Sequence, residues 1–324
     1  RPSTLDQRLA PDEAARPLLE GDRPARIRAL LSAREVAYAE THARVRTDQR
    51  SPDELATTVQ RIWNDPAIAV PLGVRSYAAR VARDPSTAVA DLLESLAPSS
   101  VFIVTDTNVA AAVGKDLESS LGPRGLRVAG TVALPPGEEH KHLGAVEHAL
   151  VTMVTMGADR DAVVVAQGGG VVSDIAGFAA STLLRGVRWI VVPTTLLAMV
   201  DASVGGKTGV DLGPAKNAVG AFHQPSGVVI GPSYVKTQSA RDYTSGLAEV
   251  VKTAALGDPE LLSLLERETE AVRARDPEIV ETMVARTIAV KAGIVTRDER
   301  ESGERALLNF GHTVGHALEA QGEY

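Results

Sequence analysis

The spacing of apolar residues changes along the chain, and its first part is helical. From residue 5 to residue 63, apolar and alanine residues recur at helical spacing, for example over 27–31. Ser51 directly before Pro52 is a typical helix start, because serine caps the helix and proline fits its first position. The pattern breaks near residue 66. We therefore predict a helical segment over residues 1–65 and a domain boundary after it.

Short apolar runs alternate with helical patterns between residues 66 and 232. This order of strand and helix predicts an α/β, Rossmann-like domain with a parallel sheet covered on both faces. Ligands bind such sheets at the carboxyl ends of the strands. The glycine-rich segment 194–213 is therefore expected to be a loop at the ligand-binding edge. The strands are predicted at 68–72, 101–104, 126–134, 162–166 and 189–192, and the helices at 109–121, 143–156 and 172–184.

Strand patterns disappear after residue 232, and helical patterns replace them. Ile279, Met283, Val290 and Ile294 follow one another at intervals of four, seven and four residues, which places them on one helix face. Residues 233–324 are therefore predicted to begin an all-α domain. No self-similarity with a period of about 20 to 50 residues is visible, which argues against a solenoid.

Length and composition narrow the class of protein. A chain of 324 residues corresponds to about two domains of roughly 150 residues each. The hydrophobic share of 44% and the charged share of 23% are ordinary for soluble domains and exclude wholesale disorder. The 34 basic and 41 acidic residues give a formal net charge of −7, which argues against nucleic-acid binding as the main function. A small anionic substrate requires only a local basic pocket.

The sequence also limits the kinds of site and the cellular setting. It contains no cysteine, so a metal must be held by histidine and carboxylate side chains. The apolar stretch at 189–204 is interrupted by Pro193 and Asp201, so no membrane segment is expected. The first residues, Arg-Pro-Ser-Thr, contain neither a Met nor an apolar signal core. We expect an internal piece of a cytoplasmic protein that acts on a small molecule.

The first candidate site is a run of three glycines at 168–170 between a predicted strand and a predicted helix. Consecutive backbone amides at a helix N-terminus favour a pyrophosphate, whereas a tight turn is the alternative explanation. Asp106 and Asn108 follow another strand, where a carboxylate can accept ribose hydroxyls. A helix cap explains that pair equally well.

Two further groups of residues are candidates for chemistry. Lys207, Lys216 and Asn217 lie among glycines and suggest an oxyanion pocket, unless they are surface residues of a flexible loop. His312 and His316 are four residues apart and would project from one helix face, where they could meet a cation. Glu249 and Lys252 share a helix face and would need a metal or substrate if they were buried. A surface histidine pair and a mutual surface ion pair are the alternatives.

In this order, over residues 66–324, the motifs closely resemble the 3-dehydroquinate synthase family of sugar-phosphate cyclases. The resemblance implies a lyase of the shikimate pathway that converts 3-deoxy-arabino-heptulosonate 7-phosphate to 3-dehydroquinate and phosphate. It also implies a homodimer, a tightly held NAD and a divalent metal, zinc or cobalt. The matching motifs are Gly168-Gly169-Gly170 with Asp174, Pro193-Thr194-Thr195, Asp201 to Asp211, Lys216-Asn217, Ala248-Glu249-Val250-Val251-Lys252 and Asn309-Phe310-Gly311-His312.

The resemblance also implies roles for individual residues. Glu249, His312 and a further histidine beyond residue 324 would bind the metal, so we expect this chain alone to bind metal poorly and to be inactive. His316 would line the reaction site. NAD would be held by Asp106, Asn108, Glu138, Lys141, Gly169, Gly170, Asp174, Thr194, Thr195 and Lys216. The substrate phosphate would contact Lys207, Asn217 and, from a neighbouring subunit, Arg185; its carboxylate and hydroxyls would contact Lys291, Arg305 and Asn309, with Asp201, Lys216 and Lys252 nearby.

The helical leader resembles the last third of shikimate kinase, through residues 16–19, Arg26, Arg28 and residues 34–38. This implies a piece of a bifunctional kinase and synthase, and an unrelated helical leader is the alternative. Other sugar-phosphate cyclases and iron-type or glycerol dehydrogenases share the fold and compete with the synthase. Lys291 and Arg305 favour a substrate with a carboxylate, and the phosphate-type cluster at 207–217 disfavours a dehydrogenase.

Overall fold

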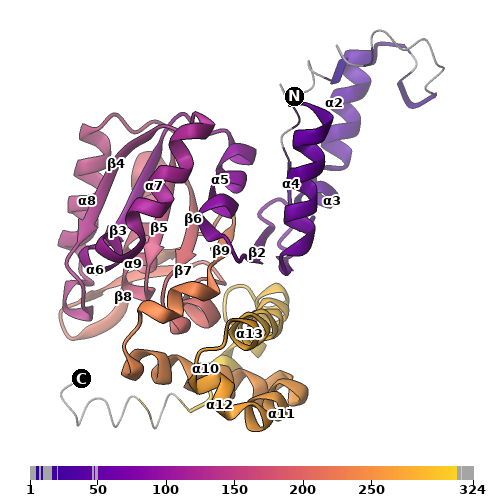
Figure 1. Cartoon of the computed structure of the whole chain (residues 1–324). Helices are drawn as coiled ribbons and strands as arrows, with labels where there is room; N and C mark the ends of the chain where they lie inside the picture. Colours follow the sequence, from indigo (N-terminus) through magenta and orange to yellow (C-terminus); the bar gives the residue numbers. More distant parts are fainter. Residues whose placement is uncertain are drawn as a thin grey trace.

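A helical arm, a sheet with helices on both faces and a group of helices below the sheet follow one another along the chain (Figure 1). The computed structural model describes residues 5, 6, 9, 17–19, 21–45, 47, 50–311 and 315. Within this part of the chain, no helix is long and apolar enough to cross a membrane. The α/β class with a helical C-terminal part is as the sequence predicts.

The arm contains α2 (Arg23–Ala33), α3 (Glu35–Ala39) and α4 (Pro52–Asn64). Helix α4 begins where the sequence predicts. The Ser51 hydroxyl accepts the Glu54 amide at 3.3 Å, and the Glu54 carboxylate accepts the Ser51 amide at 2.8 Å. This reciprocal cap satisfies two amides that the first helical turn leaves without partners. The arm is joined to the sheet domain by Arg61, whose guanidinium donates to both Asp91 oxygens at 3.0 and 2.7 Å.

The sheet has seven strands in the order β1-β2-β9-β6-β5-β3-β4. Every neighbouring pair is parallel except β1 and β2, which form an antiparallel hairpin at one edge. The central strands are continuous apolar runs because helices cover both faces. The strands are β1 (Ala67–Val70), β2 (Tyr77–Val81), β3 (Val101–Asp106), β4 (Val128–Leu134), β5 (Val163–Gly168), β6 (Arg188–Pro193) and β9 (Val228–Ile230).

The covering helices form two pairs. Helix α5 (Pro85–Leu96) packs with α7 (Lys115–Leu121), and α8 (Leu143–Thr155) packs with α9 (Gly170–Thr182). A short helix, α6 (Thr107–Val109), joins β3 to α7 through a π-helical turn. The predicted strands and helices between residues 101 and 193 are present with ends shifted by a few residues. Strand β2 and helix α5 were not predicted.

The expectation of a loop over 194–213 is wrong for much of its length, because Ala198–Ala202 form the π-helical turn η6 and a strand follows it. Strand β7 (Lys207–Leu212) pairs in an antiparallel hairpin with β8 (Ala215–Phe222), and the hairpin packs on α9. The two strands could not be predicted from apolar residues, because glycines interrupt the pattern in both of them. A Cβ at Gly220 would overlap the Thr208 carbonyl, and one at Gly209 would lie 2.8 Å from the Val219 carbonyl oxygen. Glycine is needed there because the two backbones approach closely.

The C-terminal helices begin at side-chain caps that the sequence supplies. Ser239, Asp258 and Asp276 each accept a backbone amide from the first helical turn. The helices are α10 (Ala240–Gly257), α11 (Pro259–Arg267), α12 (Thr269–Arg273) and α13 (Pro277–Arg297). Helix α13 contacts both α10 and strand β1, so its buried face is broader than the predicted stripe. Met283 and Ile294 are buried, whereas Ile279 and Val290 are only partly buried.

The carboxyl ends of the parallel strands face the C-terminal helices (Figure 1). The turn η6 (Ala198–Ala202) after β6 contacts both α10 and α13. The hairpin β7–β8 closes one side of this space. The fold therefore collects the segments that carry most of the candidate residues at one edge of the sheet.

Candidate active site

A pocket of about 550 Å³ lies between the hairpin β7–β8, the turn η6, helix α13 and the following turn η8 (Glu304–Asn309). Its volume is in the range of small-molecule sites. The structure thus brings together side chains that are up to about 135 positions apart in the sequence. The predicted site residues that line the pocket are Asp174, Asp201, Lys207, Asn217, Lys291, Arg305 and Asn309.

Lys291 is a buried cation that joins α13 to the turn η6. Its ammonium donates to the carbonyl and the carboxylate of Asp201, and its side chain is only 7% exposed. Burial lowers the pKa of Lys291, and the Asp201 carboxylate opposes this effect. The pair holds one wall of the pocket in place and presents an ammonium group to it.

Arg305 is the second buried cation of the pocket, with 3% of its surface exposed. One terminal nitrogen donates to the Gly205 carbonyl at 3.2 Å and to the Glu299 carbonyl. Gly205 has a φ of 108°, and a Cβ there would overlap the guanidinium. The Gly205 amide donates to the Tyr77 hydroxyl at 3.0 Å. Arg305 is therefore seated between a glycine backbone and the segment that precedes it.

The segment that carries Arg305 is organised by Asp298, at the end of α13. Its carboxylate accepts the amides of Ser302, Gly303 and Arg305 at 2.9, 2.7 and 3.0 Å. These hydrogen bonds to the charged form lower the pKa of Asp298 to about 2. Asp298 was not among the residues identified from the sequence, although the largely acidic run at 298–301 lies only a few residues before Arg305.

Glu301 was also missed by the sequence reasoning, and it holds two of the predicted residues. Its carboxylate pairs with the Lys207 ammonium and accepts from the Asn309 amide at 2.8 Å. Glu301 has a φ of 58°, which is uncommon for a residue with a Cβ. Residues 298–301, which we call the bracket, therefore fix Lys207, Arg305 and Asn309 relative to one another through these contacts.

A second cluster centres on Lys141, which follows β4 and is 6% exposed. Its ammonium lies 2.6 Å from the Asp174 carboxylate, 2.6 Å from the Asn217 side-chain oxygen and 3.9 Å from Glu138. Burial raises the pKa of Asp174 to about 6, and Lys141 opposes the rise. Asn217 has a φ of 52° at the start of β8. Predicted cofactor and substrate residues thus meet at the hairpin.

The Asp174 carboxyl is expected to titrate near pH 6, and Lys141→Met should raise its pKa further. Burial disfavours the carboxylate, and the variant removes the cation that stabilises it. Carboxyl ¹³C NMR over a pH series would measure both values. Lys115→Met, at an exposed position on α7, is the matched control and should leave the Asp174 titration unchanged. Titration of Asp174 at or below pH 4 in the parent chain would refute the expectation.

The glycine loop lies at the carboxyl end of β5, where α9 begins. Gly169 is the N-cap of α9, and no side chain caps this helix. A Cβ on Gly169 would lie 3.3 Å from the Thr195 methyl. The Thr194 hydroxyl is buried and, among the described residues, has no hydrogen-bond partner. Helix amides and an orphaned hydroxyl at one strand edge fit a polar, anionic cofactor.

Asp106 lies at the carboxyl end of β3 and caps α6. Its carboxylate accepts the Asn108 and Val109 amides, each at 2.9 Å. The helix cap, which the sequence offered as the alternative to a ribose contact for Asp106 and Asn108, is therefore present. It leaves the second carboxylate oxygen at the edge where the glycine loop also lies.

Glu249 and Lys252 form a mutual ion pair on α10, with side chains 17% and 10% exposed. The Lys252 ammonium also donates to the Leu308 carbonyl at 2.6 Å and so ties α10 to η8. Among the described residues, no three histidine or carboxylate side chains form a metal-binding group. The predicted ligand His312 and the predicted site residue His316 lie outside the described residues.

Two predicted residues lie at exposed positions outside both clusters. Arg185 is exposed at the end of α9 that is remote from the pocket, and its φ of 70° is unusual. Lys216 is exposed in the turn region of the hairpin β7–β8. The predicted role of Arg185 requires a contact with a second copy of the chain.

Family models of 3-dehydroquinate synthase match the chain along its site-bearing part. The N-terminal model covers residues 131–245, and the C-terminal model covers residues 246–324. The two segments meet inside α10, directly before the Glu249–Lys252 pair. The matches include every residue that lines the pocket.

Curated relatives and a solved structure agree with this match. The 3-dehydroquinate synthase of Symbiobacterium thermophilum is 49% identical over 68% of this chain and 61% of its own length. That of Dehalococcoides mccartyi strain BAV1 is 39% identical over 80% and 72%. The 2-epi-5-epi-valiolone synthase ValA of Streptomyces hygroscopicus subsp. jinggangensis, solved with NAD+ and Zn2+, is 32% identical with a TM-score of 0.69, over 75% of this chain and 68% of its own.

The chain thus spans about three fifths to three quarters of the relatives that it matches. Both family models and relatives well above 30% identity converge on one assignment. The chain belongs to the 3-dehydroquinate synthase family.

Proposed function

We propose that the protein carrying this chain converts 3-deoxy-arabino-heptulosonate 7-phosphate to 3-dehydroquinate and phosphate. The observation that carries this proposal is the convergence of Lys207, Lys291 and Arg305 on one pocket at the carboxyl edge of the sheet. Asp174, Asp201 and Glu301 line the same pocket, and in a protein that is acidic overall a group of three cations beside them supports recognition of an anion. This substrate carries both a phosphate and a carboxylate, which matches cations that reach the pocket from three elements, β7, α13 and η8.

NAD and a divalent metal such as zinc are the proposed cofactors, as in the ValA structure. The residues that would hold NAD are the glycine loop at 168–170, Asp106, Thr194 and the Lys141–Asp174 pair. NAD supplies a reversible hydride acceptor when it is bound. For the metal, the described residues supply one proposed ligand, Glu249, so the fit depends on residues such as His312 that lie outside them.

The chain's own residues bind and orient the substrate in this proposal. Arg305 and Lys291 pair with the carboxylate, because both are buried and face the pocket. Lys207 and Asn217 bind the phosphate, which must displace Glu301 from the Lys207 ammonium. Asn309 and Lys252 contact ring hydroxyls. Fixing a flexible sugar acid in one conformation contributes to the rate by lowering the entropic cost of the reaction.

Phosphate release without net NADH formation is the expected signature of this activity. NAD is regenerated within each turnover, so the full-length protein should release one phosphate per substrate at constant absorbance of the NADH band. Both signals would be followed in one assay. Stoichiometric accumulation of NADH would contradict the cyclase and favour a dehydrogenase. Equal turnover of sedoheptulose 7-phosphate, which has no carboxylate, would favour another sugar-phosphate cyclase.

Two further proposals concern the rest of the molecule. The exposed Arg185 would serve the phosphate site of a second copy, which makes the active protein a homodimer. The arm would derive from a shikimate kinase, which is supported by its helices α2 and α3 and by Arg26, Arg28 and residues 34–38. Light scattering tests the first proposal. Shikimate phosphorylation by the full-length protein tests the second.

A further inference from the structure

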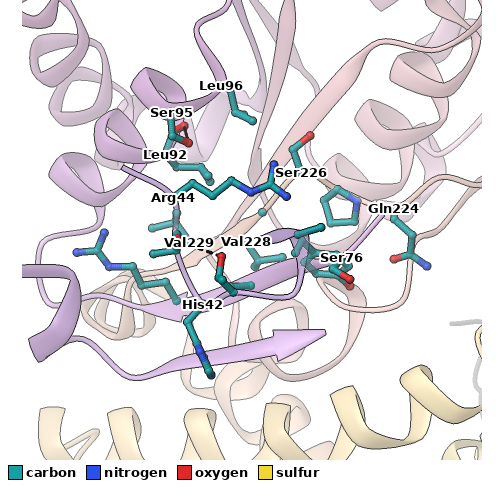
Figure 2. Close-up of a pocket in the computed structure, with 18 of the residues that line it drawn as sticks. His42, Arg44, Ser76, Leu92, Ser95, Leu96, Gln224, Ser226, Val228 and Val229 are labelled. Carbon is teal, nitrogen blue, oxygen red and sulfur yellow. Dashed lines mark hydrogen bonds between the residues drawn. The ribbon is translucent and has the colours of Figure 1, made fainter. Parts of the chain in front are cut away.

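A second cavity, of about 490 Å³, lies between the helical arm and the sheet, at the amino ends of β2, β6 and β9. We call it the arm cavity. Its apolar lining includes Leu92, Leu96, Val228 and Val229, and the exposed linker residues 41–44 form its solvent-facing side. In Figure 2 the side chain of Arg44 extends across the cavity towards Ser226. The family models begin at residue 131, so they leave the arm side of this cavity unassigned.

Two guanidinium groups of the arm cavity have no carboxylate partner among the described residues. Arg188 donates to the carbonyls of Leu96 and Asp161 at 2.6 and 2.8 Å and forms no ion pair in this part of the chain. Arg44 forms neither a hydrogen bond nor an ion pair with a described residue. The other lining arginines are compensated: Arg75 pairs with Glu299, and Arg80 pairs with Asp65. The cavity therefore combines uncompensated positive charge with an apolar floor.

We propose that the arm cavity binds a small molecule that carries one carboxylate on an apolar body. Arg44 would pair with the carboxylate at the mouth, and the apolar body would cover Leu92, Val228 and Val229. Arginine suits this role because its planar fork matches both carboxylate oxygens. The cavity volume accommodates a ligand of about ten to twenty non-hydrogen atoms, within the usual range of small-molecule sites.

The wall of the arm cavity is in contact with the segment that carries Arg305. Gln224 lines the cavity and donates to the Glu299 carboxylate at 2.9 Å. Arg75, also on the wall, pairs with the same carboxylate. The Glu299 carbonyl in turn accepts from Arg305. The arm cavity thus shares Gln224 and Arg75 with the network around Glu299 and Arg305, and we expect a ligand there to restrain residues 298–305.

Benzoate is the probe that tests this site, with benzamide as its neutral counterpart. Calorimetry on the full chain should show benzoate binding that is at least tenfold tighter than benzamide binding. Arg44→Glu should weaken benzoate binding at least tenfold. Arg28→Glu, an exposed arginine on α2 outside the cavity, should leave it unchanged. Arg44 is exposed and lies outside any helix or strand, so folding should be unaffected.

Methyl NMR locates the probe. Benzoate should shift the methyl signals of Leu92, Val228 and Val229, and amide hydrogen exchange should slow over 298–305. Shifts confined to Val204 and Leu308 would place benzoate in the active-site pocket and overturn the proposal. So would parental affinity in Arg44→Glu, or no binding at millimolar benzoate. Unchanged exchange over 298–305 would overturn the coupling to Arg305. None of these readouts depends on catalytic activity.

Discussion

Arg305→Lys is expected to lower kcat/KM for the heptulosonate phosphate by several-fold to about a hundredfold in the full-length protein. A hydrogen bond to a charged group contributes on the order of 1 to 3 kcal/mol, and each ~1.4 kcal/mol is a factor of ten. The guanidinium already holds the carbonyls of Gly205 and Glu299. A lysine ammonium has one nitrogen, so it cannot hold both carbonyls and also pair with both oxygens of a carboxylate.

Arg297→Lys is the matched control for this measurement. Arg297 likewise makes two hydrogen bonds, from two nitrogens at 2.8 and 2.7 Å from Glu304, but it lies on the surface outside the pocket. Its replacement should leave kcat/KM unchanged, because exposed ion pairs contribute little. Steady-state kinetics and thermal unfolding of both variants would separate substrate binding from folding. Parental kcat/KM in Arg305→Lys would remove Arg305 from the carboxylate site.

The elements that the sequence predicted best are those whose signal is local. Strands β3, β5 and β6 are unbroken apolar runs because both of their faces are buried, and their positions follow from composition alone. The start of α4 at Ser51–Pro52 was also predictable from neighbouring residues, because helix capping acts within one turn. The site residues lie at the ends of such elements, so their order along the chain carried the family resemblance.

The features that the sequence did not reveal depend on contacts between distant segments. The hairpin β7–β8 needs glycines because its two backbones lie very close together, and the pattern of apolar residues gives no sign of this approach. Glu301 acquires its role only when the turn after α13 meets Lys207, 94 positions earlier. The ion pair of Glu249 and Lys252 follows from their spacing on one helix, whereas the hydrogen bond from Lys252 to the Leu308 carbonyl of η8, 56 positions away, does not.

Asp298→Ala is expected to lower kcat/KM by about ten- to a hundredfold without removing any group that touches the substrate. Asp298 is a positioning residue, because it acts through the amides of Ser302, Gly303 and Arg305. Without these three hydrogen bonds, residues 298–305 hold Arg305 and Lys207 less firmly. A displacement of about 1 Å can lower the rate ~10²-fold. Asp298→Asn should recover part of the loss, because one side-chain oxygen remains as an acceptor.

The pH dependence distinguishes this role from a general loss of stability. The pKa of folded Asp298, about 2, lies below its ordinary value of 3.8, so its contribution is complete above about pH 4 and is lost as the pH falls towards 2. Amide exchange over 298–305 should therefore be constant from pH 5 to 8 and faster in Asp298→Ala throughout that range, after correction for intrinsic rates. Asp159→Ala removes a similar carboxylate cap, which accepts the Asp161 amide at 2.9 Å before β5, and should leave both kcat/KM and this exchange at parental values. An Asp298→Ala protein that has parental kinetics and slow exchange over 298–305 would show that Arg305 is held without the bracket.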